Sequence, residues 1–302
     1  SIVIGCLGAG NMFQSNQAYV QLLEVSGGVH SPLVGYGWLV GLVLAILVGL
    51  IIVGGIKSIA NVTARLVPFM ILIYIVGSLI VLTMNASAIP GAIGAIFAGA
   101  FTMHGVSGGF IGIMILGFQR AAFSNEAGLG SAAIAHAAVK TDEPLSEGFV
   151  ALLEPFMDTV VICTLTGLVL ITTLPPEVLT GGGLSGIELT SSAFESNISW
   201  SPLPLSMVAL LFAFSTMLAW AYYGIKGWTF LVGEGKLKER AFGVVFCIFI
   251  VIGASIQLSV ILDFADALIF VMAIPNIIGL YILAPDVKKD LQVYMAKLKE
   301  AQ

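Results

Sequence analysis

The sequence places charged and amide side chains inside long apolar stretches, where such groups are costly and therefore indicate a functional site. The densest group lies in GFQRAAFSNEAGLGSAAIAHAAVKTDEP, mostly within the apolar stretch 107–138. At its centre are Ser124, Asn125, Glu126, Gly128 and Gly130. Side chains that compete with the backbone, together with two glycines, favour an interruption of the helix here. The free N–H and C=O groups of such a break can hold a substrate carboxylate and coupling ions.

A simpler structural role stays open for the same segment. The stretch 107–138 is about 32 residues long, too many for one straight crossing at 1.5 Å per residue. Glu126 could pair with Arg120, six residues upstream, at a helix kink. A kink of this kind is compatible with a binding site at the same place.

Amide side chains mark the first apolar stretch, in the run GNMFQSNQ. Asn11 and Gln14 are three residues apart, so they share one face of a helix, and Asn16 follows them. A neutral amide face suits a zwitterionic or polar solute better than a bare ion. The alternative is that these amides form hydrogen bonds between membrane helices.

Hydroxyl groups occur together in the run LFAFSTMLAWAYYG, which contains Ser215 and Thr216. Their oxygens are hard ligands of the kind that an alkali cation needs. Serine and threonine in membrane helices also bond back to their own helix, and this alternative stays open.

Two carboxylates, Glu154 and Asp158, lie one helical turn apart in another apolar stretch. They could relay protons or bind a cation, or one of them could pair with Arg120, so these three residues form a candidate charge network. Asp266 lies at a predicted outer boundary, and we expect it to be in solvent. The pair Pro275–Asn276 predicts a kink.

The composition defines the elements that must position these side chains. Of 302 residues, 58% are hydrophobic and 10% are charged, against about 45–50% and about 25% in soluble domains. The mean hydropathy is +1.05. A net charge of −5 leaves no basic face for nucleic acid. We therefore predict an all-α, polytopic membrane protein.

Eight stretches are long and apolar enough to cross a bilayer, which takes about 20 residues. They are 1–24, 34–54, 67–86, 107–138, 147–173, 204–231, 241–261 and 266–284. Segments 91–101 and 188–196 are too short and are expected to form small helices at the surface. We predict one transmembrane domain, 1–285, followed by a charged cytoplasmic tail, 286–302.

The basic residues predict the orientation of these spans. Every second connector carries Lys or Arg, whereas the connectors around 25–33, 87–106, 174–203 and 262–266 carry none. The positive-inside rule makes the basic connectors, and both ends of this chain, cytoplasmic.

An enzyme is one alternative to a transporter. GVSGG at 105–109 matches the motif of intramembrane serine proteases, with Ser107 as nucleophile and His136 as base. These two residues would lie at opposite ends of one span, whereas a nucleophile and its base need about 3 Å. Three His and three Cys show no metal-ligand spacing. A channel would line its pore with rings of charge or of carbonyls, whereas here the polar groups are scattered over several helices. Both alternatives are disfavoured, and we expect no enzymatic activity.

Several blocks resemble the alanine or glycine:cation symporter family of bacteria and archaea, in the family's order from residue 1 to about 284. The blocks are GNMFQSNQ, VGLIIVGGIKSIANVTARLVPFM, FSNEAGLGSAAIAHAAVKTDEP, EPFMDTVVICTLTGLVL, FAFSTMLAWAYYG and MAIPN. The resemblance implies a LeuT-like fold of two inverted five-helix repeats. It also implies symport of small neutral amino acids (alanine, glycine) driven by Na+, without a cofactor, in the cell inner membrane.

The resemblance also implies roles for individual residues. Residues 120–138 match the broken sixth core helix, and Ser215 and Thr216 match the eighth, which helps to coordinate sodium. The implied substrate-binding residues are Asn11, Gln14, Asn16, Phe123, Ser124, Asn125, Glu126 and Gly128. Apart from sodium, no metal is implied.

The family's first core helix, with a Gly-Thr-Gly-Asn break, has no counterpart in the sequence, nor do its leading helix and second core helix. We therefore expect this chain to be the C-terminal portion of a symporter, either as a truncated gene product or as a partial sequence. Preference for alanine or glycine, coupling to sodium or protons, and oligomeric state stay open at this point.

Overall fold

The computed structural model describes residues 1–101, 109–181 and 183–300. Helices are the only regular secondary structure in these ranges, so the all-α prediction is confirmed. The physical reason is that an apolar backbone segment in lipid must satisfy its N–H and C=O groups within itself, which a helix does.

The chain opens with a nearly continuous helix that corresponds to the predicted stretch 1–24. It consists of α1 (Ile2–Leu7), the π-helical turn η1 (Gly8–Met12) and α2 (Phe13–Val25). Such π turns widen a helix locally and occur often at functional sites. Here the widened turn contains two glycines and is buried.

The remaining elements follow in the expected order. The first group is η2 (Gly28–His30), α3 (Gly37–Ile52), α4 (Gly55–Met84), η3 (Ala86–Ala88), α5 (Ile89–Phe101), α6 (Gly109–Asn125) and α7 (Ser131–His136). The second is α8 (Pro144–Ala151), α9 (Leu153–Pro155), the π-helical η4 (Phe156–Cys163), α10 (Thr164–Thr173), α11 (Pro176–Gly181) and α12 (Ile187–Glu195). The last is α13 (Pro202–Val232), α14 (Lys236–Gly253) and α15 (Leu258–Glu300). The two predicted short helices, 91–101 and 188–196, correspond to α5 and α12.

Some predicted boundaries are wrong. Helix α4 begins at Gly55, so the basic residues Lys57 and Arg65 are helical and not in a connector. Helix α15 runs through residue 286 without interruption, so the tail up to Glu300 continues the last helix instead of forming a separate one. Charge ends an apolar stretch, but it does not end a helix, because Lys, Arg and Glu are good helix formers.

Two clusters of buried apolar residues hold the helices together. The first joins α1, α3, α13, α14 and α15, with Met217, Phe246 and Ile269 among its members. The second joins α4, α10, α12 and the start of α13, around Tyr74 and Phe194. Helix α13 contributes to both clusters and therefore links them.

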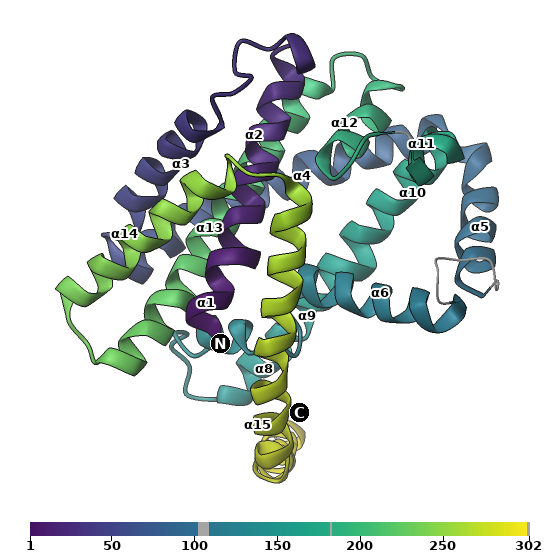
Figure 1. Cartoon of the computed structure of the whole chain (residues 1–302). Helices are drawn as coiled ribbons and strands as arrows, with labels where there is room; N and C mark the ends of the chain where they lie inside the picture. Colours follow the sequence, from purple (N-terminus) through teal and green to yellow (C-terminus); the bar gives the residue numbers. More distant parts are fainter. Residues whose placement is uncertain (102–108, 182, 301–302) are drawn as a thin grey trace.

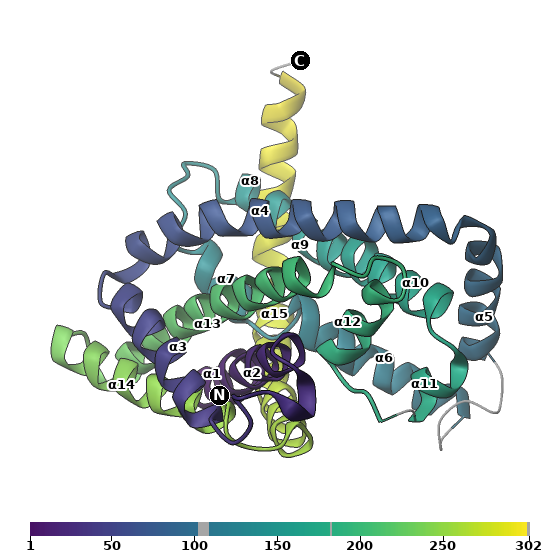
Figure 2. The same cartoon turned by 90° about the horizontal axis from the view of Figure 1, so that it is seen from above.

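Figures 1 and 2 show how these groups are arranged. Helix α4 crosses the width of the molecule in Figure 2, from the side of α3 and α14 to the side of α5. In Figure 1 the α2–α3 and α14–α15 connections lie toward the top, and the α7–α8 and α13–α14 connections lie toward the bottom. Helices α2, α13 and α14 thus run between the same two ends of the molecule.

Within the described residues, four helical segments are both long and apolar enough to cross a membrane. They are Gly55–Met84, Pro144–Thr173, Pro202–Val232 and Leu258–Glu300. Shorter apolar helices cover Gly37–Ile52 and Ala86–Phe101. The structure thus supports several membrane-spanning helices, and the count of eight stays a prediction.

Candidate functional site

The chain unwinds where the sequence predicts a broken helix. Helix α6 ends at Asn125 and α7 begins at Ser131, and the five residues between them are not helical. Three of these residues have positive φ: Glu126 at 58°, Gly128 at 83° and Gly130 at 86°. The predicted break at 124–130 is therefore confirmed. We refer to residues 126–130 as the unwound segment.

The glutamate is the unusual member of this segment, since it is the only described non-glycine residue with positive φ. The left-handed conformation costs an L-residue about 1–2 kcal/mol, whereas glycine adopts it freely. Contacts of the glutamate side chain must offset this cost. Its Oε1 accepts a hydrogen bond of 2.7 Å from Nε1 of Trp220, on α13.

The start of the unwound segment is tied to η4. Nδ2 of Asn125 donates to Oγ1 of Thr159 at 2.8 Å, and Oδ1 of Asn125 accepts from the backbone N–H of Ala127 at 2.9 Å. Oγ of Ser124 donates to Oδ2 of Asp158 at 2.5 Å. Two of the predicted substrate-binding residues therefore contact the predicted 147–173 span.

Its end is tied to α15. Nδ2 of Asn276 donates to the main-chain oxygen of Gly128 at 2.8 Å. A Cβ at Gly130 would lie 2.8 Å from Oδ1 of the same asparagine, so this position also needs glycine for space. Leu129 points into the first apolar cluster and is buried. The sequence left the role of Asn276 open, and the structure shows that its amide binds the unwound backbone.

Arg120 has a different partner from those expected. Its guanidinium pairs with Asp266 of α15, and not with Glu126, Glu154 or Asp158. The expectation that Asp266 lies in solvent is wrong, because its side chain is only 17% exposed. The guanidinium carbon also lies 5.8 Å from the ring centre of Phe123.

Phe123 in turn contacts the first helix of the chain. Its ring meets the ring of Phe13 edge to face, with centroids 5.0 Å apart. This predicted substrate-binding residue thus joins α6 to α2 directly beside the unwound segment.

The two carboxylates of the candidate charge network diverge. Asp158 accepts from Ser124, as above, whereas Oε2 of Glu154 lies 3.2 Å from Nε2 of His136. Nδ1 of the same histidine lies 2.5 Å from Oε1 of Glu147. The histidine at the end of α7 is therefore held between carboxylates of α8 and α9, and Arg120 takes no part.

The amide side chains of the first helix bind main-chain carbonyls of neighbouring helices. Nδ2 of Asn11 donates to the oxygen of Phe246 at 2.8 Å, and Nδ2 of Asn16 donates to the oxygen of Ile256 at 2.8 Å. This geometry matches the hydrogen bonds between helices that the sequence left open. Oδ1 of Asn11 and Oε1 of Gln14 are buried, and neither has a hydrogen-bond partner among the described residues.

The hydroxyl pair on α13 is not in contact with the unwound segment through any hydrogen bond between described residues. Oγ of Ser215 donates to the main-chain oxygen of Phe212 at 3.0 Å, one turn earlier on the same helix. Thr216 follows it, four residues before Trp220, or about 6 Å along the axis.

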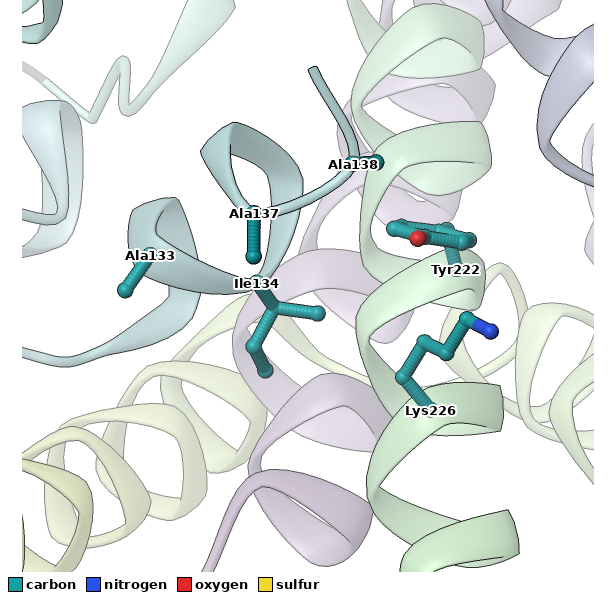
Figure 3. Close-up of a pocket in the computed structure, with 6 residues that line it drawn as sticks. All are labelled: Ala133, Ile134, Ala137, Ala138, Tyr222 and Lys226. Atoms are coloured by element: carbon teal, nitrogen blue, oxygen red, sulfur yellow. The ribbon is translucent and has the colours of Figure 1, made fainter. Parts of the chain in front are cut away.

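A cavity of about 610 Å3 lies between α7 and α13 (Figure 3). Ala133, Ala137 and Ala138 face it from α7 and the residues that follow, and Tyr222 and Lys226 face it from α13. Nζ of Lys226 lies 5.8 Å from the ring centre of Tyr222. The predicted substrate-binding residues do not line this cavity, which lies on the α7 side of the unwound segment.

Sequence reasoning missed Trp220, which supplies the only tie from α13 to the side chains of the unwound segment among the described contacts. A tryptophan with its indole N–H inside an apolar helix is a usable signal, because a buried indole N–H usually has a partner. The residue identity indicates that a partner exists, but not which one. Ser107, the alternative protease nucleophile, lies outside the described residues.

Comparison with known proteins identifies the family. The family model described as the sodium:alanine symporter family matches residues 1–302. The chain belongs to this family. It is a family of transporters and not of enzymes, so the prediction of transport is confirmed at this level.

Two relatives match over most of the chain. The sodium/alanine symporter AgcS of Methanococcus maripaludis is 39% identical over 289 residues, which is 95% of this chain and 62% of that protein. The amino-acid carrier protein AlsT of Bacillus subtilis is 34% identical over 93% of this chain and 60% of its own length. The chain thus spans about three-fifths of the length of these relatives.

Proposed function

We propose that this chain forms part of a sodium-coupled symporter that carries small neutral amino acids, alanine and glycine, across the cell inner membrane. The observation that carries this proposal is the unwound segment 126–130, held by side chains from α13, α15 and η4. Free backbone N–H and C=O groups at such a break bind the charged ends of an amino acid and its coupling ion. Membership of the family supports the same conclusion.

The arrangement supplies both kinds of group that a zwitterion needs. Buried acceptor oxygens of Asn11 and Gln14, which have no described partner, can receive an ammonium group. Backbone N–H groups of the unwound segment can receive a carboxylate. We propose the substrate-binding set Asn11, Gln14, Asn16, Phe123, Ser124, Asn125, Glu126 and Gly128.

Sodium is the proposed second cargo. The hydroxyls of Ser215 and Thr216 would supply two of its oxygens, and Ser215 would then exchange its bond to the carbonyl of Phe212 for the ion. The names of the relatives support this coupling, since AgcS is a sodium/alanine symporter and AlsT an amino-acid carrier.

We further propose the LeuT-like fold with eight membrane helices in this chain, its residues 1–285 forming the transmembrane domain and its C-terminus cytoplasmic. The broken helix of 109–136 is the feature that supports this fold, because broken helices at the midplane are typical of inverted-repeat transporters. The remaining helices of a complete transporter would lie outside this chain, because the chain spans only 62% of AgcS.

The test is uptake of labelled alanine by the natural full-length protein in proteoliposomes. We expect saturable uptake that requires an inward sodium gradient and collapses when potassium replaces sodium. Unlabelled glycine should compete with the label. Uptake that rises linearly with alanine concentration would instead favour a channel, and uptake that follows a proton gradient without sodium would contradict the coupling ion.

A further inference from the structure

Glu126 occupies a backbone conformation that would be easier for glycine. Its neighbours at positive φ in the unwound segment, Gly128 and Gly130, are both glycines. A side chain at this strained position indicates that the side chain itself is needed. Its described hydrogen-bond partner is the indole N–H of Trp220, at 2.7 Å.

The indole is placed by the first helix. The ring of Trp220 is 2% exposed and lies directly against Gly10, in the π-helical turn η1. A Cβ on Gly10 would overlap the indole ring. The glycine in η1 therefore leaves the space that lets the indole reach the unwound segment, and three elements meet at this contact.

We propose that Trp220 is a positioning residue that holds the unwound segment in its substrate-binding form through Glu126. This inference rests on the proposed function, because it assumes that the unwound segment binds the amino acid. The indole touches neither cargo in this role. It fixes the carboxylate of Glu126, and with it the direction of the backbone N–H groups that follow.

The chain offers a matched control for the indole N–H. Trp228, also on α13, donates from Nε1 to the main-chain oxygen of Lys238 at 3.1 Å, near the start of α14 and away from the unwound segment. Replacing either tryptophan by phenylalanine removes one N–H and keeps an aromatic ring. Only Trp220→Phe removes the bond to Glu126.

The first measurement is hydrogen–deuterium exchange of the full-length protein in detergent, followed in peptides that cover residues 120–136. A hydrogen bond to a charged group contributes enough that its loss should speed exchange there about tenfold in Trp220→Phe. Trp228→Phe should leave these peptides unchanged. Glu126→Gln keeps an acceptor oxygen and should retain protection, whereas Glu126→Ala should lose it as Trp220→Phe does.

The glycine provides an independent test of the same contact. Gly10→Ala leaves the indole chemically intact but displaces its ring, so it should speed exchange of the same peptides. If Gly10→Ala fails to fold, Trp220→Phe and Glu126→Ala still decide the matter. Unchanged exchange in both of those variants would overturn the proposal.

The second measurement is sodium-driven uptake, which separates positioning from folding. A mis-positioned segment should raise the KM for alanine about tenfold in Trp220→Phe while the maximal rate per folded protein stays within about twofold. A merely structural role would lower the maximal rate and leave KM unchanged, and this result would overturn the proposal. If the wild-type protein shows no uptake, the proposed function fails, but the exchange measurement still reports whether Trp220 holds Glu126.

Discussion

Arg120 shows at the scale of a residue why spacing along the chain does not identify a partner. Its three expected partners, Glu126, Glu154 and Asp158, all follow it within 38 positions, yet its guanidinium pairs with Asp266, 146 positions away. The pairing depends on α15 packing against α6, which no local pattern encodes. Phe123 covers one side of the guanidinium and so limits its contact with solvent.

This ion pair should contribute modestly to stability. Its side chains are 42% and 17% exposed, so solvent screens the attraction, and we expect Asp266→Asn to lower the free energy of unfolding by about 1 kcal/mol. The measurement is thermal or denaturant unfolding in detergent. Asp263→Asn is the control, since this exposed neighbour should change stability by less than about 0.5 kcal/mol.

A double-mutant cycle checks that the two residues act together. Arg120→Gln combined with Asp266→Asn should cost less than the sum of the two single changes, because the second change removes a group that has already lost its partner. Costs that add without remainder would show that the ion pair contributes nothing to the folded state.

Local chemistry made some site residues predictable and left others unpredictable. The break at 124–130 could be predicted because Ser124, Asn125 and the glycines are neighbours in sequence and act on their own backbone. Trp220 and Asn276 could not be assigned, because their partners lie 94 and 148 positions away. A polar side chain in an apolar helix indicates that a partner is needed, and only the packing of helices decides which.

At the scale of an element, the unwound segment allows backbone strain to be separated from crowding. Gly128 and Gly130 both have positive φ, but a Cβ on Gly128 would meet nothing within 4 Å, whereas one on Gly130 would press on Asn276. We expect Gly128→Ala to cost about 1–2 kcal/mol from backbone strain alone. Gly130→Ala should cost more, because it also displaces the amide that binds Gly128.

Gly117 is the matched control for these substitutions, measured by unfolding of each variant in detergent. It lies inside α6, where a Cβ would meet nothing within 4 Å, so Gly117→Ala should stabilise the helix by about 0.5–1 kcal/mol. Equal effects of Gly128→Ala and Gly130→Ala would contradict the role of Asn276. A loss of stability in Gly117→Ala would contradict the backbone argument.

Helix ends were less predictable than the helices themselves. A hydropathy pattern ends where charges begin, which placed the starts and ends of α4 and α15 wrongly. Helix α15 continues past Pro275 and Pro285 to Glu300. The positions of these ends depend on helix propagation and on packing, such as the contact between the rings of Phe149 and Tyr294, which are 6.0 Å apart and hold the last turns of α15 against α8.

At the scale of the whole molecule, α13 determines how the parts are joined. It is 31 residues long, or about 46 Å, and it supplies buried side chains to both apolar clusters. Trp220, Tyr222 and Lys226 place the unwound segment and the cavity along the same helix. The sequence predicted this helix almost to the residue, but not that it links the two clusters, because that property belongs to the assembled fold.

The length of α13 leads to a prediction of topology. A helix of about 46 Å exceeds the hydrocarbon core of about 30 Å, so its two ends should lie on opposite sides of the membrane. Lys236 and Lys238 follow its C-terminal end, whereas the connector before it contains no Lys or Arg, so the C-terminal end should be cytoplasmic. Ser199 and Glu234 are exposed and flank the helix.

Cysteine labelling tests this topology in a full-length protein whose own cysteines, including those at positions 6, 163 and 247, are replaced by alanine. A membrane-impermeant maleimide added to intact cells should label Ser199→Cys and not Glu234→Cys. Permeabilised cells should label both, which controls for reactivity. The reverse pattern would invert the predicted orientation, and labelling of both variants in intact cells would show that α13 does not cross the membrane, because a spanning helix cannot present both ends to the same side.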